Sequence, residues 1–402
     1  MNPEIMFFDI RLNIPFMKKS NIAFLIFLSS LPFFVQAQSI TKDYKVVTSA
    51  VPFLTISPDS KAAALGDAGV ASNPDANSIY WNTSKLAFAP NKYGASFSYA
   101  PWLRDLVQDM GLMNLSGYYK ISDKQALTMG LTYFDQGLIQ FTNSNGDDLD
   151  RFHSREMSFT AGIAQKLSSD FSMGLNLKYI NSNLVGSNVV NGTAGKPGQT
   201  AAIDLGIYYN KNRPSDSDHK TDFSYGLWLQ NLGGKVNYGF GEYFIPANLK
   251  VGTQISHKPD EHNTFRFLVD FNKLLVPTPQ GDRSELDLAV LPSIIGSFND
   301  APGGMAEELR EVMASIGAEY NYDEMVALRA GYFYESRSKG DRKYFTTGIG
   351  VKLKDTYNID LAYLIPAKTG NPLANTWRIT LNFAMPYSLL KSRQNANLED
   401  EE

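Results

Sequence analysis

The side chains of this chain that could carry chemistry are its histidines and the carboxylates that recur in its strand-like segments. The histidines are His153, His219, His257 and His262, and none of their spacings matches a metal motif such as HExxH. The sequence contains no cysteine, which excludes disulfides, zinc-thiolate sites and thiol nucleophiles. It also lacks a G-x-S-x-G elbow, so the sequence gives no support to metal binding or nucleophilic catalysis.

Carboxylates occur in the strand-like segments at Asp204, Asp270, Glu319 and Asp360. They share the polar face of these segments with a set of basic side chains: Lys178, Lys250, Arg266, Arg329, Lys352 and Arg378. Charges of both signs on one face indicate ion pairing and hydration more than acid–base catalysis. We therefore expect a protein without enzymatic activity, without a cofactor and without a bound metal.

The elements that position these charges are β-strands, as the last regular segment, Thr376–Phe383, illustrates. Its Trp, Ile, Leu and Phe alternate with Thr, Arg, Thr and Asn, and successive residues of a strand point to opposite faces. Five further segments confine their charges to one face: Phe171–Tyr179, Ile203–Tyr209, Phe265–Phe271, Val326–Glu335 and Tyr357–Tyr363. A Lys or Arg facing lipid near the bilayer midplane costs about 2–4 kcal/mol, so a membrane would impose this segregation.

Alternation also fits a soluble sandwich or barrel whose apolar face points inward. Composition favours lipid on the outside, because aromatic residues reach 12%, charged residues only 19%, and the mean hydropathy is −0.23. An export signal, the number of strand-like segments and the lengths of their connections point the same way. The predicted fold is all-β: a transmembrane antiparallel β-barrel of about fourteen strands over residues 93–385.

The connections alternate between short turns and longer loops, as in outer-membrane barrels. The longer ones are Gly137–Asp150, Val185–Gln199, Gly233–Tyr243, Leu274–Met313 and Pro366–Ala374. In the longest of them, Met305–Val312 is predicted to form a short helix with acidic residues near its start. An even strand number places both chain ends on the periplasmic side of the outer membrane.

Residues 1–37 are predicted to be a signal peptide, because two lysines precede a short apolar run that ends just before Ala37. Residues 1–16 would be an upstream extension, with Met17 as the true start, and an uncleaved membrane anchor is the alternative. The other predicted regions outside the barrel are a periplasmic or hatch segment and an acidic periplasmic tail, at residues 38–92 and 386–402.

The segment Leu65–Phe88 resembles the N-terminal hatch signature of the FadL-type barrel superfamily. The matching blocks are Gly66–Ala71, Asp75-Ala76 and Trp81-Asn82, although Thr83-Ser84 replaces the usual Pro-Ala after Asn82. The resemblance implies a FadL-like barrel with a hatch or plug-like segment before its first strand. The hatch residues would be Gly66, Asp67, Gly69, Asp75, Trp81 and Asn82.

Within that superfamily the chain is most similar to the PorV family of the type IX secretion system of Bacteroidota. The similar stretches span nearly the whole mature chain: Thr41–Asp59, Tyr99–Arg104, Ser297–Glu308, Arg329–Glu335 and Asn371–Thr376. The resemblance implies a non-enzymatic outer-membrane barrel that binds the C-terminal signal domain of secreted cargo. Such cargo leaves a Sov-type translocon and is shuttled to a surface attachment complex containing PorU, PorQ and PorZ.

The resemblance makes the outward loops the expected cargo surface. The candidate contact residues are Phe298, Asp300, Pro302, Gly303, Gly304, Asn371, Pro372 and Asn375. The alternative within the superfamily is a FadL-like transporter of fatty acids or other hydrophobic molecules, and a passive porin is a third hypothesis. A nucleic-acid partner is not expected, because the net charge is −4 and the pI is near 5.7.

Overall fold

The computed structural model describes residues 46–104, 106–142, 145–190, 193–211, 220–279, 288–354 and 356–385. All of them lie in one compact unit, Tyr44–Glu402. The predicted signal peptide, residues 1–37, and the predicted acidic tail, residues 386–402, lie outside the described residues.

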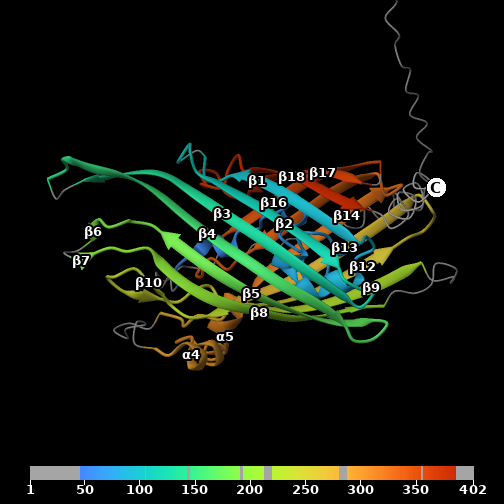
Figure 1. Cartoon of the computed structure of the whole chain (residues 1–402), viewed down its shortest axis with the longest axis horizontal. Coiled ribbons are helices and arrows are strands. Elements are labelled where there is room, and N and C mark those ends of the chain that lie inside the picture. Colours follow the sequence, from blue (N-terminus) through green and yellow to red (C-terminus); the bar gives the residue numbers. More distant parts are fainter. Residues whose placement is uncertain are drawn as a thin grey trace, which may run out of the picture. The chain divides into compact units, whose positions relative to one another are not determined.

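Within the described residues, fourteen antiparallel strands close into one barrel (Figure 1). Neighbours in the barrel are also neighbours in the chain, and β1 closes the ring on β18, with Tyr93 opposite Met385. The barrel strands are β1 (Tyr93–Pro101), β2 (Gly111–Lys120), β3 (Gln125–Thr142), β4 (Asp148–Lys166), β5 (Phe171–Asn183), β8 (Gly198–Asn210), β9 (Thr221–Gly233), β12 (Asn248–His257), β13 (Asn263–Leu274), β14 (Met313–Tyr322), β15 (Val326–Tyr334), β16 (Lys343–Leu353), β17 (Tyr357–Pro366) and β18 (Trp377–Met385). The predicted fourteen-stranded all-β barrel is confirmed.

The apolar face of each strand is the outer face of the barrel. In β5, Met173, Leu175 and Leu177 are exposed, whereas Asn176 and Lys178 between and beyond them are buried. The same alternation runs through β17 and β18. Because the exposed rows are hydrocarbon-like and the buried rows carry the charges, the outer wall suits lipid and the inner wall does not. The predicted orientation of the two faces is thereby confirmed.

The two ends of the barrel differ in their connections. Short turns join the strands at one end, for example residues 121–124 between β2 and β3 and residues 167–170 between β4 and β5. The connections at the other end carry small elements of their own: β6 (Val189–Val190), β7 (Thr193–Ala194), β10 (Val236–Asn237), β11 (Glu242–Tyr243), α4 (Val290–Gly296), α5 (Met305–Glu308) and η4 (Leu309–Glu311). The predicted helix Met305–Val312 corresponds to α5 and η4 in succession, whereas α4 was not predicted.

The predicted long loop Gly137–Asp150 is wrong, because most of its residues belong to strands. β3 continues through Thr142 and β4 begins at Asp148, which extends these two strands as a ribbon (Figure 1). The pairing shifts register between Asp135 and Leu138, and Gly137 has a φ of +78° there. Gly137, the first residue of the predicted loop, therefore forms a bulge inside a strand.

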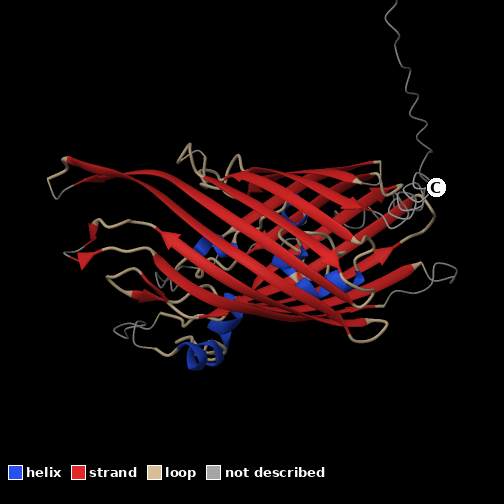
Figure 2. Cartoon of the chain, viewed as in Figure 1, coloured by secondary structure: helices blue, strands red, loops and turns tan. Residues whose placement is uncertain are grey.

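The segment before β1 forms short helices inside the ring of strands. In the described part of this segment they are η1 (Pro52–Thr55), α2 (Ser60–Ala63), α3 (Ser78–Trp81) and η2 (Thr83–Phe88). α2 contacts β16, β17 and β18, whereas η2 contacts β2, β3, β4, β5 and β8 on the opposite side. Figure 2 shows short helices, in blue, within the ring of strands. None of the helices in the described residues is long and apolar enough to cross a membrane.

Candidate functional site

Close backbone contacts hold the predicted hatch residues against the barrel wall. Gly66 has a φ of +69°, and a Cβ there would lie 2.6 Å from the backbone nitrogen of Tyr332. Gly331 of β15 faces it, and a Cβ on Gly331 would lie 2.1 Å from the backbone nitrogen of Gly66. Both positions require glycine, because the clashing atoms are backbone atoms that cannot turn aside.

Asp270, an inward side chain of β13, accepts hydrogen bonds from the next turn of the segment. The N–H groups of Gly69 and Val70 donate to its Oδ2 atom at 2.6 and 2.9 Å. The indole ring of Trp81 packs on Gly69, where a Cβ would come within 2.4 Å of the ring. The Nε1–H of Trp81 donates to Asp59 Oδ2 at 2.6 Å, which closes the segment on itself.

The other three motif residues are held in a similar way. Asp67 accepts a hydrogen bond from the Tyr344 hydroxyl at 2.5 Å, and Asp75 forms an ion pair with Lys61 at 2.8 Å. The Asn82 side chain donates to a backbone carbonyl of β8 at 3.0 Å. All six motif residues thus hold the segment together or against the wall, and their role in a gate stays a prediction.

The inner wall carries buried ion pairs, as the mixed charges predicted. Arg329 donates to Glu319 and to Asp360, each at 2.6 Å, and all three side chains are at least nine-tenths buried. Lys178 pairs with Asp204 at 3.2 Å. These carboxylates are saturated by cations from neighbouring strands, which gives them a structural role and leaves no acid–base pair poised for catalysis there.

A cavity of about 690 Å³ lies between the N-terminal segment and the long-loop end of the barrel. Its walls come from that segment, from strands including β12, β13, β16 and β18, and from the loops after β1, β13, β15 and β17. The volume is within the range of small-molecule pockets. Polar side chains of the wall reach into it, among them Asn248, Lys250, Asn272 and Arg378.

The loop between β13 and β14 exposes large apolar side chains. Leu291 is 73% exposed, Ile295 75%, Met305 65% and Leu309 67%, and Phe298 is also exposed. These five residues define what we call the loop patch. Leu291 and Ile295 are one helical turn apart on α4, as are Met305 and Leu309 on α5 and η4, so each pair shares one helix face. Large exposed apolar side chains gathered in one loop favour an interaction surface.

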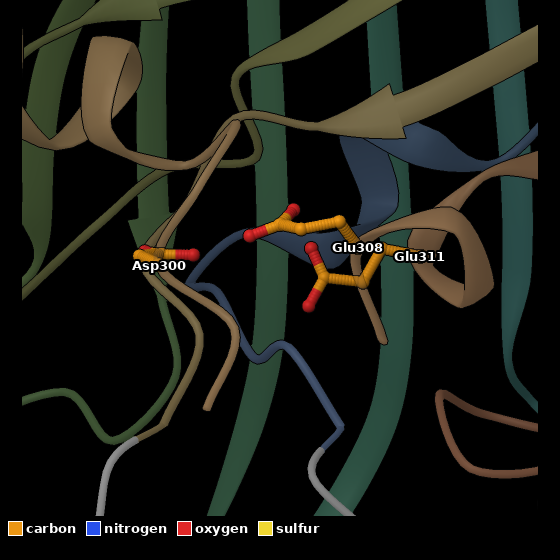
Figure 3. A group of neighbouring side chains, drawn as sticks. All are labelled: Asp300, Glu308 and Glu311. Carbon is orange, nitrogen blue, oxygen red and sulfur yellow. The ribbon is translucent and has the colours of Figure 1, made fainter. Parts of the chain in front are cut away.

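Three carboxylates of the same loop, Asp300, Glu308 and Glu311, gather beside α5, with oxygens within 4.8 Å of one another (Figure 3). The ammonium groups of two lysines lie beside these carboxylates. Lys273 contacts Glu308 at 2.9 Å and Glu311 at 2.5 Å, and Lys339 contacts Glu311 at 2.8 Å. The cluster is therefore an ion-pair network that fastens the loop to β13 and to the loop after β15, and we do not assign it to a metal.

The electrostatics of this network differ between its two ends. Burial opposes ionisation of Glu311, but hydrogen bonds from Lys273, Lys339 and Thr278 outweigh it and lower the pKa of that carboxyl. Burial raises the pKa of Asp300, and the nearby charges of Glu308 and Glu311 raise it further. The network thus favours a charged Glu311 and disfavours a charged Asp300.

The predicted contact residues fall on two different surfaces. Four of them, Phe298, Pro302, Gly303 and Gly304, are exposed on the loop between β13 and β14, and the half-buried Asp300 accepts the Thr278 N–H at 3.1 Å.

Asn371 and Pro372 instead line the cavity, together with the hatch residues Asp67 and Trp81. Asn375 has a φ of 58° and accepts a hydrogen bond from the Tyr363 hydroxyl at 3.2 Å.

Sequence reasoning missed the most exposed members of the loop patch, Leu291, Ile295, Met305 and Leu309. A signal was present, because no charged residue occurs from Leu288 to Asn299 although this stretch lies in a long loop. It also missed the polar cavity residues Asn248 and Asn272, and it assigned Lys250 and Arg378 only to the polar faces of their strands. For these positions the sequence offers no signal beyond strand alternation.

The chain is similar to one protein family and to several solved structures. The family model described as "Type IX secretion system protein PorV" matches residues 39–281. The solved toluene transporter TbuX of Ralstonia pickettii is 12% identical, with 81% of this chain and 98% of that chain covered and a TM-score of 0.46. The toluene transporter TodX of Pseudomonas putida is 15% identical, with 80% and 95% covered and a TM-score of 0.45. No curated protein matches the chain in sequence.

Proposed function

The chain belongs to the PorV family of type IX secretion system proteins, and from this membership we propose that it receives secreted cargo at the outer membrane. In this proposal it binds the C-terminal signal domain of cargo that leaves a Sov-type translocon. It then delivers the cargo to a surface attachment complex of the PorU, PorQ and PorZ type. The work is binding and transfer without a catalytic step.

The observation that carries the proposal is the loop patch. Leu291, Ile295, Met305 and Leu309 are each at least 65% exposed at the long-loop end, which is the outward end of an outer-membrane barrel. A partner that fully buries one such side chain gains about 1.5–3 kcal/mol. Burial of two of them changes an affinity by about a hundredfold or more. The patch thus suits a partner that binds from outside the barrel.

The ion-pair network below the patch supports the same role. Glu308 and Glu311 are buried, and their bonds to Lys273 and Lys339 hold α5 and η4 against the barrel. A loop fastened in this way presents its apolar side chains in one arrangement before the partner arrives. Such preorganisation lowers the entropy that binding loses.

The test replaces Leu291 and Ile295 by serine in a strain that lacks the wild-type protein. We expect secreted surface proteins to accumulate in the periplasm, with the variant present in the outer membrane in normal amount. Val189→Ser is the matched control, because Val189 is 67% exposed on a different loop of the same end. Full secretion with the double variant would contradict the proposal, and so would an equal secretion defect with the control.

The competing proposal is a FadL-like transporter of fatty acids or other hydrophobic molecules. The cavity of about 690 Å³ inside the barrel is the observation that favours it. Deletion of the protein separates the two roles. Loss of secreted surface proteins with unchanged growth on fatty acids supports cargo binding, and the reverse result supports transport.

A further inference from the structure

Three polar side chains of the cavity wall form one group on two paired strands. Lys250 of β12 and Asn272 of β13 are partners in the strand register, and Asn248 precedes Lys250 by two residues on the same face. Each is more than nine-tenths buried, and each lines the cavity. The barrel thus places an ammonium group and two carboxamide groups side by side on its inner wall.

These groups lack the partners that buried polar groups normally have. The Oδ1 atoms of Asn248 and Asn272 are buried and have no hydrogen-bond donor in the part of the chain that the structure describes. Within the same described residues, the Lys250 ammonium has no carboxylate at ion-pair distance, and it lies over the rings of Tyr80 at 4.6 Å and Trp81 at 4.9 Å. Burial of such groups is unfavourable unless something bonds to them.

The charges elsewhere on the cavity wall are largely matched. Lys339 pairs with Glu311 at 2.8 Å, and the Arg342 guanidinium pairs with Glu335 at 2.8 Å. Arg378, on the opposite wall, lies 5.6 Å from the ring of Trp102, and its Nε–H finds no acceptor among the described residues. In the described residues, the unmatched groups of the cavity are therefore two cations, the carboxamide oxygens, the Ser57 hydroxyl and the Oδ1 atom of Asp67. Together they fit a ligand that carries both an anionic group and N–H donors.

We propose that this cavity binds the carboxyl-terminal end of an extended polypeptide. The terminal carboxylate pairs with Lys250, and backbone N–H groups of the last residues donate to the side-chain oxygens of Asn248 and Asn272. A fatty acid would satisfy the ammonium but would offer no donor to either carboxamide. A peptide end carries both groups a few bonds apart, so it fits all three side chains.

The cavity is placed where such a chain end could enter. Gly340 and Pro372, which belong to the loops after β15 and β17, line it and are exposed. The aromatic rings of Tyr80 and Trp81 form its floor beneath Lys250. The inference rests on the proposed function in one respect only, namely that the polypeptide would be secreted cargo.

The test measures binding to the full-length protein in detergent micelles. The probes are two pools of fluorescein-labelled octapeptides of randomised sequence, one with free carboxyl termini and one with amidated termini. We expect the free-acid pool to bind at least tenfold more tightly by fluorescence anisotropy. Lys250→Gln should reduce the affinity for the free acids to that for the amides. Lys92→Gln is the matched control, because Lys92 also lies over a ring, that of Tyr119 at 5.7 Å, and does not line the cavity.

Equal binding of the two pools, or an acid preference that survives Lys250→Gln, would overturn the inference. Displacement of the peptides by equimolar decanoate would also overturn it, because the site would then recognise an aliphatic carboxylate. Asn272→Leu is a second variant in case Lys250→Gln does not fold. It should weaken binding of the free-acid pool several-fold, since one acceptor is lost and the ammonium remains.

The same assay separates this inference from the proposed function. The variant with serine at positions 291 and 295 should bind the free-acid pool like the wild type, whatever it does to secretion. If secretion is unaffected by that variant and the acid preference still depends on Lys250, the proposed function fails and the peptide site stands. If secretion is lost and the acid preference is absent, the peptide site fails alone.

Discussion

The hatch signature, Leu65–Phe88, and the loop between β13 and β14 both lie outside the barrel strands, and they use their side chains in opposite ways. The hatch is built from small residues, and Leu65 is 1% exposed in it. The loop exposes Leu291 and Ile295 by 73% and 75%. The first segment directs its apolar and polar groups at the barrel itself, whereas the second leaves its largest apolar side chains outside.

This difference separates residues that stabilise the barrel from residues that are available to a partner. Hatch contacts such as those of the Asp270 Oδ2 atom with Gly69 and Val70 are made within the chain. Exposure of the loop patch does not stabilise the isolated protein, because the hydrophobic effect favours burial of apolar side chains. Substitutions should therefore change stability in one region and binding in the other, and the following predictions test that division.

The largest loss of stability is expected from Arg329→Met in the inner wall that surrounds the hatch. The substitution leaves the buried Asp360 carboxylate without its ion-pair partner, whereas Glu319 keeps Arg266. Removal of one partner from a buried ion pair typically costs about 3–5 kcal/mol. Urea unfolding in detergent micelles, followed by tryptophan fluorescence, measures the effect. A loss below 1 kcal/mol would show that these ion pairs do not stabilise the inner wall.

A somewhat smaller loss is expected from Gly331→Ala. The new Cβ would lie 2.1 Å from the backbone nitrogen of Gly66, and overpacking of this kind costs about 1–3 kcal/mol. The heat-modifiable shift on a denaturing gel should occur at a lower temperature. Gly296→Ala is the matched control, because a Cβ there meets no atom within 4 Å. If both variants lowered the temperature of the gel shift equally, glycine would not be required where the hatch meets β15.

A local and pH-dependent effect is expected for the loop. The pKa of Glu311 is lowered, so its ion pairs stabilise the loop above the ordinary glutamate pKa of 4.5 and are lost as the pH falls through the lowered value. The raised pKa of Asp300 acts in the opposite sense and relieves part of the loss on acidification. Pepsin should therefore cut the loop faster below about pH 4 than at pH 5.

Glu311→Gln sharpens that experiment because it removes the charge at every pH. Trypsin at neutral pH should cut after the exposed Arg310 several-fold faster in this variant than in the wild type. Unchanged cleavage would mean that Lys273 and Lys339 do not fasten the loop.

The smallest change of stability is expected in the loop patch. Serine at positions 291 and 295 should alter the free energy of unfolding by no more than about 0.5 kcal/mol, as is usual for exposed sites. Leu65→Ala in the hatch should cost about 2–5 kcal/mol, because Leu65 is fully enclosed. Similar losses of unfolding free energy in both regions, measured by urea unfolding, would contradict the proposed difference between them.

Much of the barrel could be predicted from the sequence because its main signal is local. The side-chain period of a strand is two residues, so Met173, Leu175 and Leu177 share a face whatever the rest of the chain does. The face of each strand that meets lipid is apolar, so every strand repeats the same sequence signal. Turn residues were less reliable, since Gly137 indicated a loop and forms a bulge.

The hatch motif could be recognised, but its contacts could not, because they join residues far apart in the chain. Gly66 meets Gly331 and Asp67 meets Tyr344 only in the folded barrel, because each pair is far apart in the sequence. The same holds for Lys250 and Asn272, which alternation assigned to the polar face without saying which other groups they approach.

By itself, the sequence determined the barrel, its strand number and the side that meets lipid. Short-range alternation marks the strands, and composition, the export signal and the connection lengths favour lipid on the outside. Only the tertiary structure decided which apolar loop residues stay exposed and which buried cations stay unmatched. Exposure and pairing depend on the three-dimensional arrangement of distant segments, and no local pattern encodes that arrangement.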